Sequence, residues 1–433
     1  MASSQKKLLV IQAAALGYEL VHKNGFSHWQ GLEFKPLQAV FPAVTCTAQA
    51  SFRTGLPSGT HGMVGNGFFH HDLMRPMFWE QACRLVEGPR IWDKYQENGH
   101  SVAMLFWQQS LGESADYLIS PAPIHKHHGG MIQSCYSKPA SLYPSIRKHT
   151  SRDFNLMHYW GPLASAKSSN WIAEASASVL ANPDVAADLC FTYLPVLDYD
   201  LQRHGPDSPQ ALKALNILFQ ELETLLTAAD KNGYDVLIFG DYAISSVTRG
   251  AVLPNLALQK SGLFHCRNIK GANYPDFYTS PAFAVVDHEI AHIHVNASDK
   301  KEEVFRVLRN LPGVGEVLDK EAQQAQNIAH ERSGDFIIIA EEGYWFAYPW
   351  WEDKKQAPDY ASHVDIHNKP GYDPCELFFG WPPMSISQNT GKIKGTHGRI
   401  DGDRQVAMAS TFSFENEPES LLNLARSIQN RLD

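Results

Sequence analysis

Short apolar runs alternate along the chain with longer segments in which apolar residues recur at helical spacing. Four runs have the length and composition of buried strands: LLVI at 8–11, SVAMLF at 101–106, LCFTYLPVL at 189–197 and DVLIF at 235–239. A helical pattern that stops at Gly99 precedes the second run, and one that stops at Gly233 precedes the fourth. This alternation predicts an α/β fold, with a doubly wound, mostly parallel sheet and helices on both faces.

Two regions interrupt the alternation and are predicted to be insertions at one end of the sheet. Residues 115–165 are rich in Pro, His and Tyr, and residues 255–385 contain the pattern of a small α+β unit followed by YPWWEDKKQAPDY. We expect the first to form a lid and the second a cap, since such insertions commonly shape access to a site. Residues 1–114, 166–254 and 386–433 would then form one discontinuous core.

Composition and charge narrow the class of protein. Hydrophobic residues make up 44% of the chain and charged residues 19%, as in folded globular proteins. The net charge of −9, from 46 acidic and 37 basic side chains, argues against binding to a nucleic-acid polymer. No apolar run approaches the roughly 18 residues of a membrane span, so a cytoplasmic location is the default expectation. The oligomeric state is left open.

The segment FPAVTCTAQASFRTG at 41–55 carries the first chemical signal. Its residues 46–54 are predicted to form a helix that stops at Gly55, which places Thr45 at the helix N-terminus. Free backbone N–H groups and the positive end of the helix dipole favour an anion there, and they lower the cost of a hydroxyl acting as an alkoxide. The simpler alternative is an ordinary Thr cap.

Other polar residues follow the predicted strands. Asp200 and His204 come just after the third strand and lie four positions apart, so one helical turn would place them on the same face as a pair of metal ligands. His204 could equally be an exposed residue before a turn. Asp241 follows the fourth strand, where ligands gather in open α/β sheets, and His397 lies between glycines that permit close approach to a ligand.

The order of these features resembles the alkaline phosphatase superfamily, and specifically its type I phosphodiesterase/nucleotide pyrophosphatase branch. The most specific match is Thr45 followed by Thr54-Gly55, Pro57, His61-Gly62 and Asn66. Segments at 287–292, 330–335 and 364–374 are similar to those of a nucleotide pyrophosphatase-like subgroup. The resemblance implies an alkaline-phosphatase-like core and a metal-dependent phosphoric-ester hydrolase that acts through a phospho-threonine intermediate. Thr45 would be the nucleophile and Asn66 would hold the phosphoryl oxygens.

The resemblance also implies two divalent metal ions, zinc in the first instance, with manganese or iron as alternatives. Asp200, His204 and His397 would hold the first ion, and Asp241 would belong to the second site. Active members carry an Asp at the end of the first strand and a His after the strand-final Asp, where this chain has Ala14 and Tyr242. The second site therefore lacks two of its usual ligands.

Three explanations remain open for these departures: other side chains supply the ligands, one ion suffices, or the protein is a pseudoenzyme that binds a phosphorylated metabolite without turnover. The histidine-rich segments of the insertions offer substitutes, with Asp287 and His288 in the first of them. The candidate replacement ligands for metal or substrate are Asp365, His367, His292, Arg332 and Lys369. A hydrogen-bonded structural role is the simpler interpretation of each histidine. In every case the expected partner is a small phosphorylated molecule.

Overall fold

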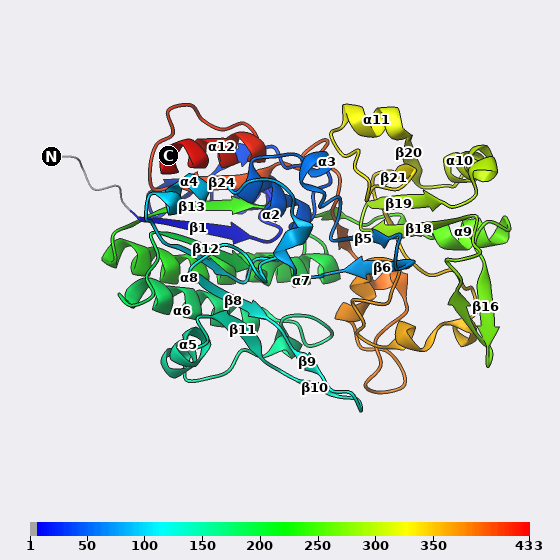
Figure 1. Cartoon of the computed structure of the whole chain (residues 1–433), viewed down its shortest axis with the longest axis horizontal. Helices are drawn as coiled ribbons and strands as arrows, with labels where there is room; N and C mark the ends of the chain where they lie inside the picture. The colour runs from blue at the N-terminus through cyan, green and yellow to red at the C-terminus, as the bar shows by residue number, and fades with distance from the viewer. Residues whose placement is uncertain (1–6) are drawn as a thin grey trace.

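A computed structural model describes residues 7–433, in which a large mixed sheet forms the centre of one half of the molecule (Figure 1). Its eight strands, in order across the sheet, are β11 (Cys135–Lys138), β8 (Tyr117–Pro121), β7 (Val102–Leu105), β12 (Leu189–Leu194), β1 (Lys7–Ala13), β13 (Tyr234–Gly240), β24 (Val406–Ser410) and β4 (Lys35–Leu37). The strands from β8 to β13 run parallel, whereas β11 and β24 run antiparallel to their neighbours. The predicted α/β fold is confirmed. The four predicted strands correspond to β1, β7, β12 and β13, which are neighbours in the sheet.

Helices cover both faces of this sheet. Phe52 of α2 (Thr45–Thr54) packs against Phe191 of β12, whereas the next residue of the strand, Thr192, bonds to Ser176 of α6 (Ala166–Ala181). Because neighbouring residues of a strand point to opposite faces, α2 and α6 lie on opposite sides. The remaining core helices are α1 (Tyr18–Lys23), α3 (Ser58–His61), α4 (Asp93–Glu97), α5 (Leu142–Thr150), α7 (Val196–His204), α8 (Pro209–Lys231) and α12 (Leu421–Leu432).

A buried carboxyl group lies where α6 packs against α8. Glu221 accepts a hydrogen bond from the Ser169 hydroxyl at 2.7 Å, while its Oε1 has no hydrogen-bond partner among the described residues. Burial raises the pKa of Glu221 to about 8, and the Ser169 hydrogen bond opposes that rise. The folded protein therefore keeps this proton over a pH range in which the unfolded chain loses it.

Replacing Glu221 with glutamine is expected to stabilise the protein at alkaline pH. The wild type loses stability as pH rises from about 4.5 to about 8 through this group, because the unfolded carboxyl ionises first. The variant has no such loss, so its advantage should grow from near zero at pH 5 to about 2–4 kcal/mol at pH 9. Urea-induced unfolding at the two pH values measures it, with the exposed Glu223→Gln as control. An equal difference at both pH values would contradict the assignment.

A second sheet forms the centre of the other half of the molecule (Figure 1). It is antiparallel, in the order β18 (Ala282–Asp287), β19 (Ile290–Val295), β21 (Phe336–Ala340) and β20 (Val314–Leu318), and it packs with α9 (Pro254–Lys260), α10 (Lys301–Arg309) and α11 (Lys320–Ala325). It lies inside the predicted 255–385 insertion. Short two-stranded pairs surround it, among them β5 (Gly67–His70) with β6 (Arg75–Phe78) and β16 (Cys266–Ile269) with β17 (Ala272–Pro275).

The predicted 115–165 insertion differs from expectation. It contributes β8 and β11 to the edge of the main sheet, so part of it belongs to the core. The end of β8, the hairpin of β9 (Ile124–His125) and β10 (Met131–Ile132), and the segment around 156–160 reach the large cavity described below. The Pro- and His-rich residues lie mostly outside these two strands, whose sequences are YLISP and CYSK, so the composition of the whole region concealed them. Among residues 7–433, no helix has the length and apolar character that a membrane crossing requires.

Candidate active site

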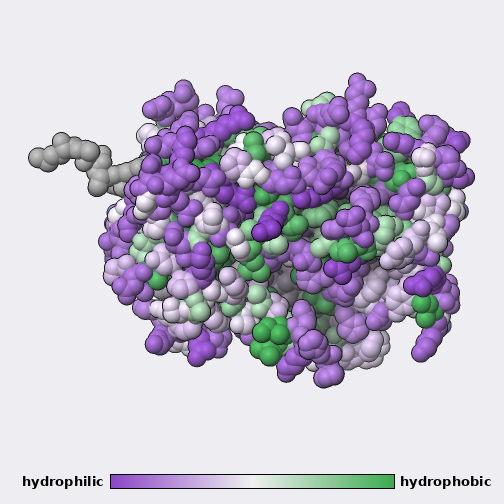
Figure 2. All heavy atoms as spheres, in the orientation of Figure 1, coloured by the Kyte–Doolittle hydropathy of each residue, from purple (hydrophilic) through white to green (hydrophobic). Residues whose placement is uncertain are grey.

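A cavity of about 1,090 Å³ opens where the ends of the core strands meet the two insertions. Its inner end contains Thr45 and Asn66, and its outer walls come from residues 120–160 and 364–368. Hydrophobic residues are visible in the hollow between the two halves of the molecule (Figure 2). The cavity lies outside the carboxyl ends of parallel strands, where open α/β sheets bind ligands.

Thr45 is the first residue of α2, as the sequence predicted. Val44 before it is extended, and the helix ends at Gly55 in the left-handed conformation, with φ 68°. Thr45 and Tyr193 both line the cavity. Burial raises the pKa of Tyr193 well above its usual value, so that phenol stays neutral. A hydroxyl at a buried helix N-terminus, facing a ligand-sized cavity, can act as a nucleophile.

Asn66 connects this helix N-terminus to the cap. Its Oδ1 accepts from the Cys46 backbone N–H at 3.1 Å, and its Nδ2 donates to Asp287 Oδ1 at 3.1 Å. The Asn66 backbone N–H also donates to Asp287 Oδ2 at 2.7 Å. Asn66 therefore holds the start of α2 against a carboxylate from the end of β18, with one Nδ2 hydrogen left for a phosphoryl oxygen.

Asp287 and His288 form a buried pair beside Asn66. The two side chains are joined at 2.7 Å between Oδ1 and Nδ1, and the His288 Nε2 has no partner among the described residues. The His288 ring lies against Tyr372, with centroids 3.9 Å apart, and against His397 at 3.7 Å. Burial lowers the pKa of His288 well below its usual value, so the ring is neutral. The sequence named this pair only as one of several histidine-rich possibilities.

The structure does not bring Asp200 and His204 together with His397. Asp200 is paired with Arg203 at 3.7 Å and is 34% exposed, and His204 is exposed. Instead Asp198 and Gln202, two positions earlier on α7, face the cavity. The expected ligand set is corrected accordingly: the same four-residue spacing applies, but the helix turns Asp198 inward and the histidine position is occupied by glutamine.

Asp198 is fully engaged by neutral donors. The Gln202 Nε2 lies 2.8 Å from each of its oxygens, and the Tyr242 hydroxyl donates to its Oδ1 at 2.8 Å. Gln202 in turn exchanges hydrogen bonds with the Tyr372 hydroxyl at 2.9 and 3.0 Å. Burial raises the pKa of Asp198 to about 6, while the Tyr242 and Gln202 hydrogen bonds oppose the rise. The carboxylate is satisfied without a cation.

Asp241 and Ala14 lie together at the carboxyl ends of β13 and β1. The Ala15 and Tyr242 backbone N–H groups both donate to Asp241 Oδ1 at 3.0 Å. Its Oδ2 has no partner among the described residues, and burial raises the Asp241 pKa well above its usual value. Ala14 is fully buried beside it and offers only a methyl group. The Tyr242 ring stacks on His397 with centroids 3.5 Å apart.

These donors do not fit the two divalent ions that the resemblance implies. Asp241 Oδ2 and His397, whose Nδ1 is bonded to the Ala43 carbonyl at 2.8 Å, could each supply one ligand atom. However, the Asp198 oxygens are occupied, Gln202 replaces an imidazole, and Ala14 and Tyr242 remove two further ligands. Within residues 7–433 no three His, Cys, Asp or Glu side chains are arranged to hold an ion. Zinc normally requires at least three protein ligands.

The candidate replacement ligands do not complete a metal site. Asp365 and His367 line the cavity, but Asp365 binds the Asn368 amide and His367 Nδ1 is bonded to the Phe78 carbonyl at 2.9 Å. The other three have structural partners: His292 bonds Val64 and Gly334, Arg332 bonds Gly62, Leu85 and Glu87, and Lys369 bonds Asp373 and Glu376. None of these three residues lines the cavity.

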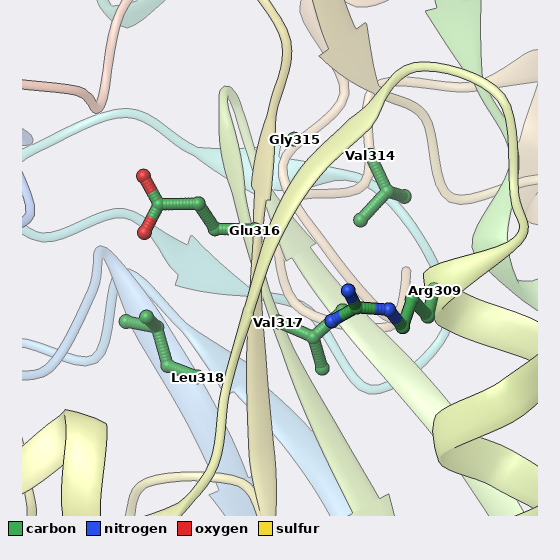
Figure 3. Close-up of a pocket in the computed structure, with 6 residues that line it drawn as sticks. All are labelled: Arg309, Val314, Gly315, Glu316, Val317 and Leu318. Carbon is green, nitrogen blue, oxygen red and sulfur yellow. The ribbon is translucent and has the colours of Figure 1, made fainter.

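A smaller hollow of about 350 Å³ lies along the edge strand β20 (Figure 3). Arg309 and Glu316 are its charged residues, and the rest are Val314, Gly315, Val317 and Leu318. Arg309, from the end of α10, lies on one side of the strand, whereas Glu316 and Leu318 lie on the other, so the side chains do not converge on a common point (Figure 3). The chemistry of the chain is therefore concentrated in the large cavity.

The mixed α/β fold and the match to a family model place the chain in the alkaline phosphatase superfamily. The chain belongs to the type I phosphodiesterase/nucleotide pyrophosphatase family, whose model matches residues 9–373. Family membership supports a phosphoric-ester hydrolase of the phosphodiesterase or pyrophosphatase type.

Solved structures support the fold. Phosphonoacetate hydrolase from Sinorhizobium meliloti 1021, in complex with phosphonoformate, is similar with a TM-score of 0.63 and 13% identity, over 99% of this chain and 96% of that one. Murine ectonucleotide pyrophosphatase/phosphodiesterase 5 is similar with a TM-score of 0.57 and 15% identity, over 98% and 95%. An inactive form of the murine protein, in complex with AMP, gives a TM-score of 0.58 at 14% identity, over 99% and 95%.

Proposed function

We propose that this chain hydrolyses a small phosphoric ester, with Thr45 as the nucleophile. The observation that carries the proposal is the position of Thr45, at the first turn of a buried helix and at the inner end of the cavity. The helix N-terminus favours the phosphate, and the Asn66 and Asp287 contacts hold that N-terminus in place. Family membership supplies the reaction class.

The reaction consists of two displacements at phosphorus. The Thr45 oxygen bonds to phosphorus while the ester P–O bond breaks, and the departing alcohol takes up a proton. Water then cleaves the phospho-threonine bond, which releases phosphate from a monoester or a phosphomonoester from a diester and restores the hydroxyl. Tyr193 lines the same cavity, and we assign it the exchange of a proton with Thr45. A bound divalent ion would supply charge neutralisation at the phosphate, but the present donors do not fit one, and no step is assigned to it.

A second candidate is a protein that binds the ester without turnover. The specific observation in its favour is the Asp198, Gln202 and Tyr242 network, which satisfies a carboxylate that the resemblance leads us to expect on a metal. Assays with bis-p-nitrophenyl phosphate, p-nitrophenyl phosphate and AMP, each with EDTA or with added zinc or manganese, separate the two. Turnover that survives EDTA supports the proposal. Ester binding without turnover in any condition would favour the second candidate.

A further inference from the structure

The walls of the large cavity are mostly apolar. Its volume of about 1,090 Å³ exceeds the upper end of the usual range for small-molecule sites. Its apolar lining residues include Phe106, Leu111, Leu156, Met157, Trp160 and Ile366. They come from the core, from the first insertion and from the cap, so several separate segments of the chain contribute to one apolar surface.

The charges around the cavity have a single sign. Among the described residues that line it, none is Lys or Arg, whereas Glu80, Asp198 and Asp365 are acidic. Arg53, in the last turn of α2, does not line the cavity and bonds the Gln108 and Gln109 carbonyls. A diphosphate or triphosphate would therefore meet no cationic side chain that could neutralise it.

The inner end can nevertheless hold one phosphate. The α2 N-terminus faces it, and His288, which is 3% exposed, lines the cavity with an Nε2 that has no partner among the described residues. A buried ring nitrogen without a partner in a ligand-sized cavity indicates a hydrogen-bonding group on the ligand. Beyond it, the walls offer an organic group mainly apolar contacts.

We propose that the ligand is a single phosphate esterified to a large apolar alcohol, a long-chain alkyl or alkenyl group, and that nucleotides are poor ligands. The position of the phosphate next to Thr45 rests on the proposed function. The apolar character of the alcohol is inferred only from the residues that line the cavity. Burying each added methylene should tighten binding about fourfold until the cavity is filled.

Isothermal titration of the full chain with butyl, hexyl, octyl and decyl phosphate, each below its micelle concentration, tests the proposal. Affinity should rise with chain length, and AMP should bind at least about a hundredfold more weakly than decyl phosphate. Affinity that is flat with chain length, no binding of any alkyl phosphate, or AMP as the tightest ligand would overturn the proposal. If decanol binds as tightly as decyl phosphate, the phosphate does not contribute to binding, and that part of the proposal is overturned.

A pair of matched variants locates the binding. Ile366 lines the cavity outside the hydrophobic core clusters, and Ile269 is 44% exposed on the same insertion but away from the cavity. Ile366→Asp should weaken decyl phosphate binding at least about tenfold, whereas Ile269→Asp should leave it unchanged. Equal effects would overturn the assignment. Chain-length-dependent binding without turnover would reject only the hydrolase proposal, while hydrolysis of AMP without decyl phosphate binding would reject only this inference.

Discussion

Replacing Thr45 with alanine is expected to lower the turnover of phosphoric esters by about a thousandfold or more. The change removes the oxygen that bonds to phosphorus, and no other hydroxyl begins a helix at the inner end of the cavity among the described residues. Ligand binding should change much less, since the helix N-terminus and Asn66 remain. Steady-state kinetics together with titration of the ester measures the two effects separately.

Thr45→Ser is the matched control, because it keeps the hydroxyl and removes only a methyl group. It should retain measurable turnover, and both variants should unfold at temperatures close to that of the wild type. Turnover that persists in the alanine variant would show that the hydrolysis does not proceed through this residue. An alanine variant that fails to bind would point to a positioning role for the Thr45 side chain.

Restoring the missing ligands is expected to create a metal-dependent site. A variant with Ala14→Asp, Gln202→His and Tyr242→His adds a carboxylate beside Asp241, supplies an imidazole beside Asp198 and releases Asp198 from the Tyr242 hydroxyl. We expect it to retain about one or two zinc ions per chain after dialysis, where the wild type retains none. Its melting temperature should fall without metal and recover with zinc, because the added carboxylate is buried beside another.

Metal analysis and thermal unfolding check this expectation. The same variant with Asp241→Asn serves as control and should lose the metal that it gained. A wild type that already holds zinc or manganese as tightly as the restored variant would contradict our interpretation of the donor set.

The core and the position of Thr45 at a helix N-terminus could be predicted from sequence because local pattern determines them. The four apolar runs have the length and composition of buried strands, and the helical segments between them favour parallel order. Thr45 follows an extended segment and begins a helix that ends at a glycine, and each of these signals is local. The strand-final Asp241 follows from the same rule, since ligand-binding residues lie at the carboxyl ends of such strands.

The cavity-facing residues of α7 could not be chosen by spacing. Asp198 and Asp200 are each followed, four positions later, by a polar residue. Only the packing of the helix against the sheet turns Asp198 inward. The presence of an imidazole at 204 favoured the wrong pair. Leu197 and Leu201 are buried beside Asp198 and Gln202, and this apolar spacing could have indicated the inward face.

The residues that the cap contributes to the site could not be predicted from the sequence pattern either. Asp287 lies 221 positions from Asn66, and their contact depends on how the second sheet rests on the core. Similarly, histidine content suggested metal binding at His292, whereas its two ring nitrogens bond backbone groups. Side-chain type alone does not distinguish a buried, satisfied histidine from a ligand.

Mass spectrometry of the acid-quenched protein during turnover tests the Thr45 mechanism most directly. The wild type, mixed with a hydrolysed ester and quenched within its turnover time, should carry one phosphoryl group on the peptide that contains Thr45, and Thr45→Ser should carry it on the serine. Sustained turnover in which that peptide stays unmodified at every quench time, with Thr45→Ala equally active, would contradict the mechanism.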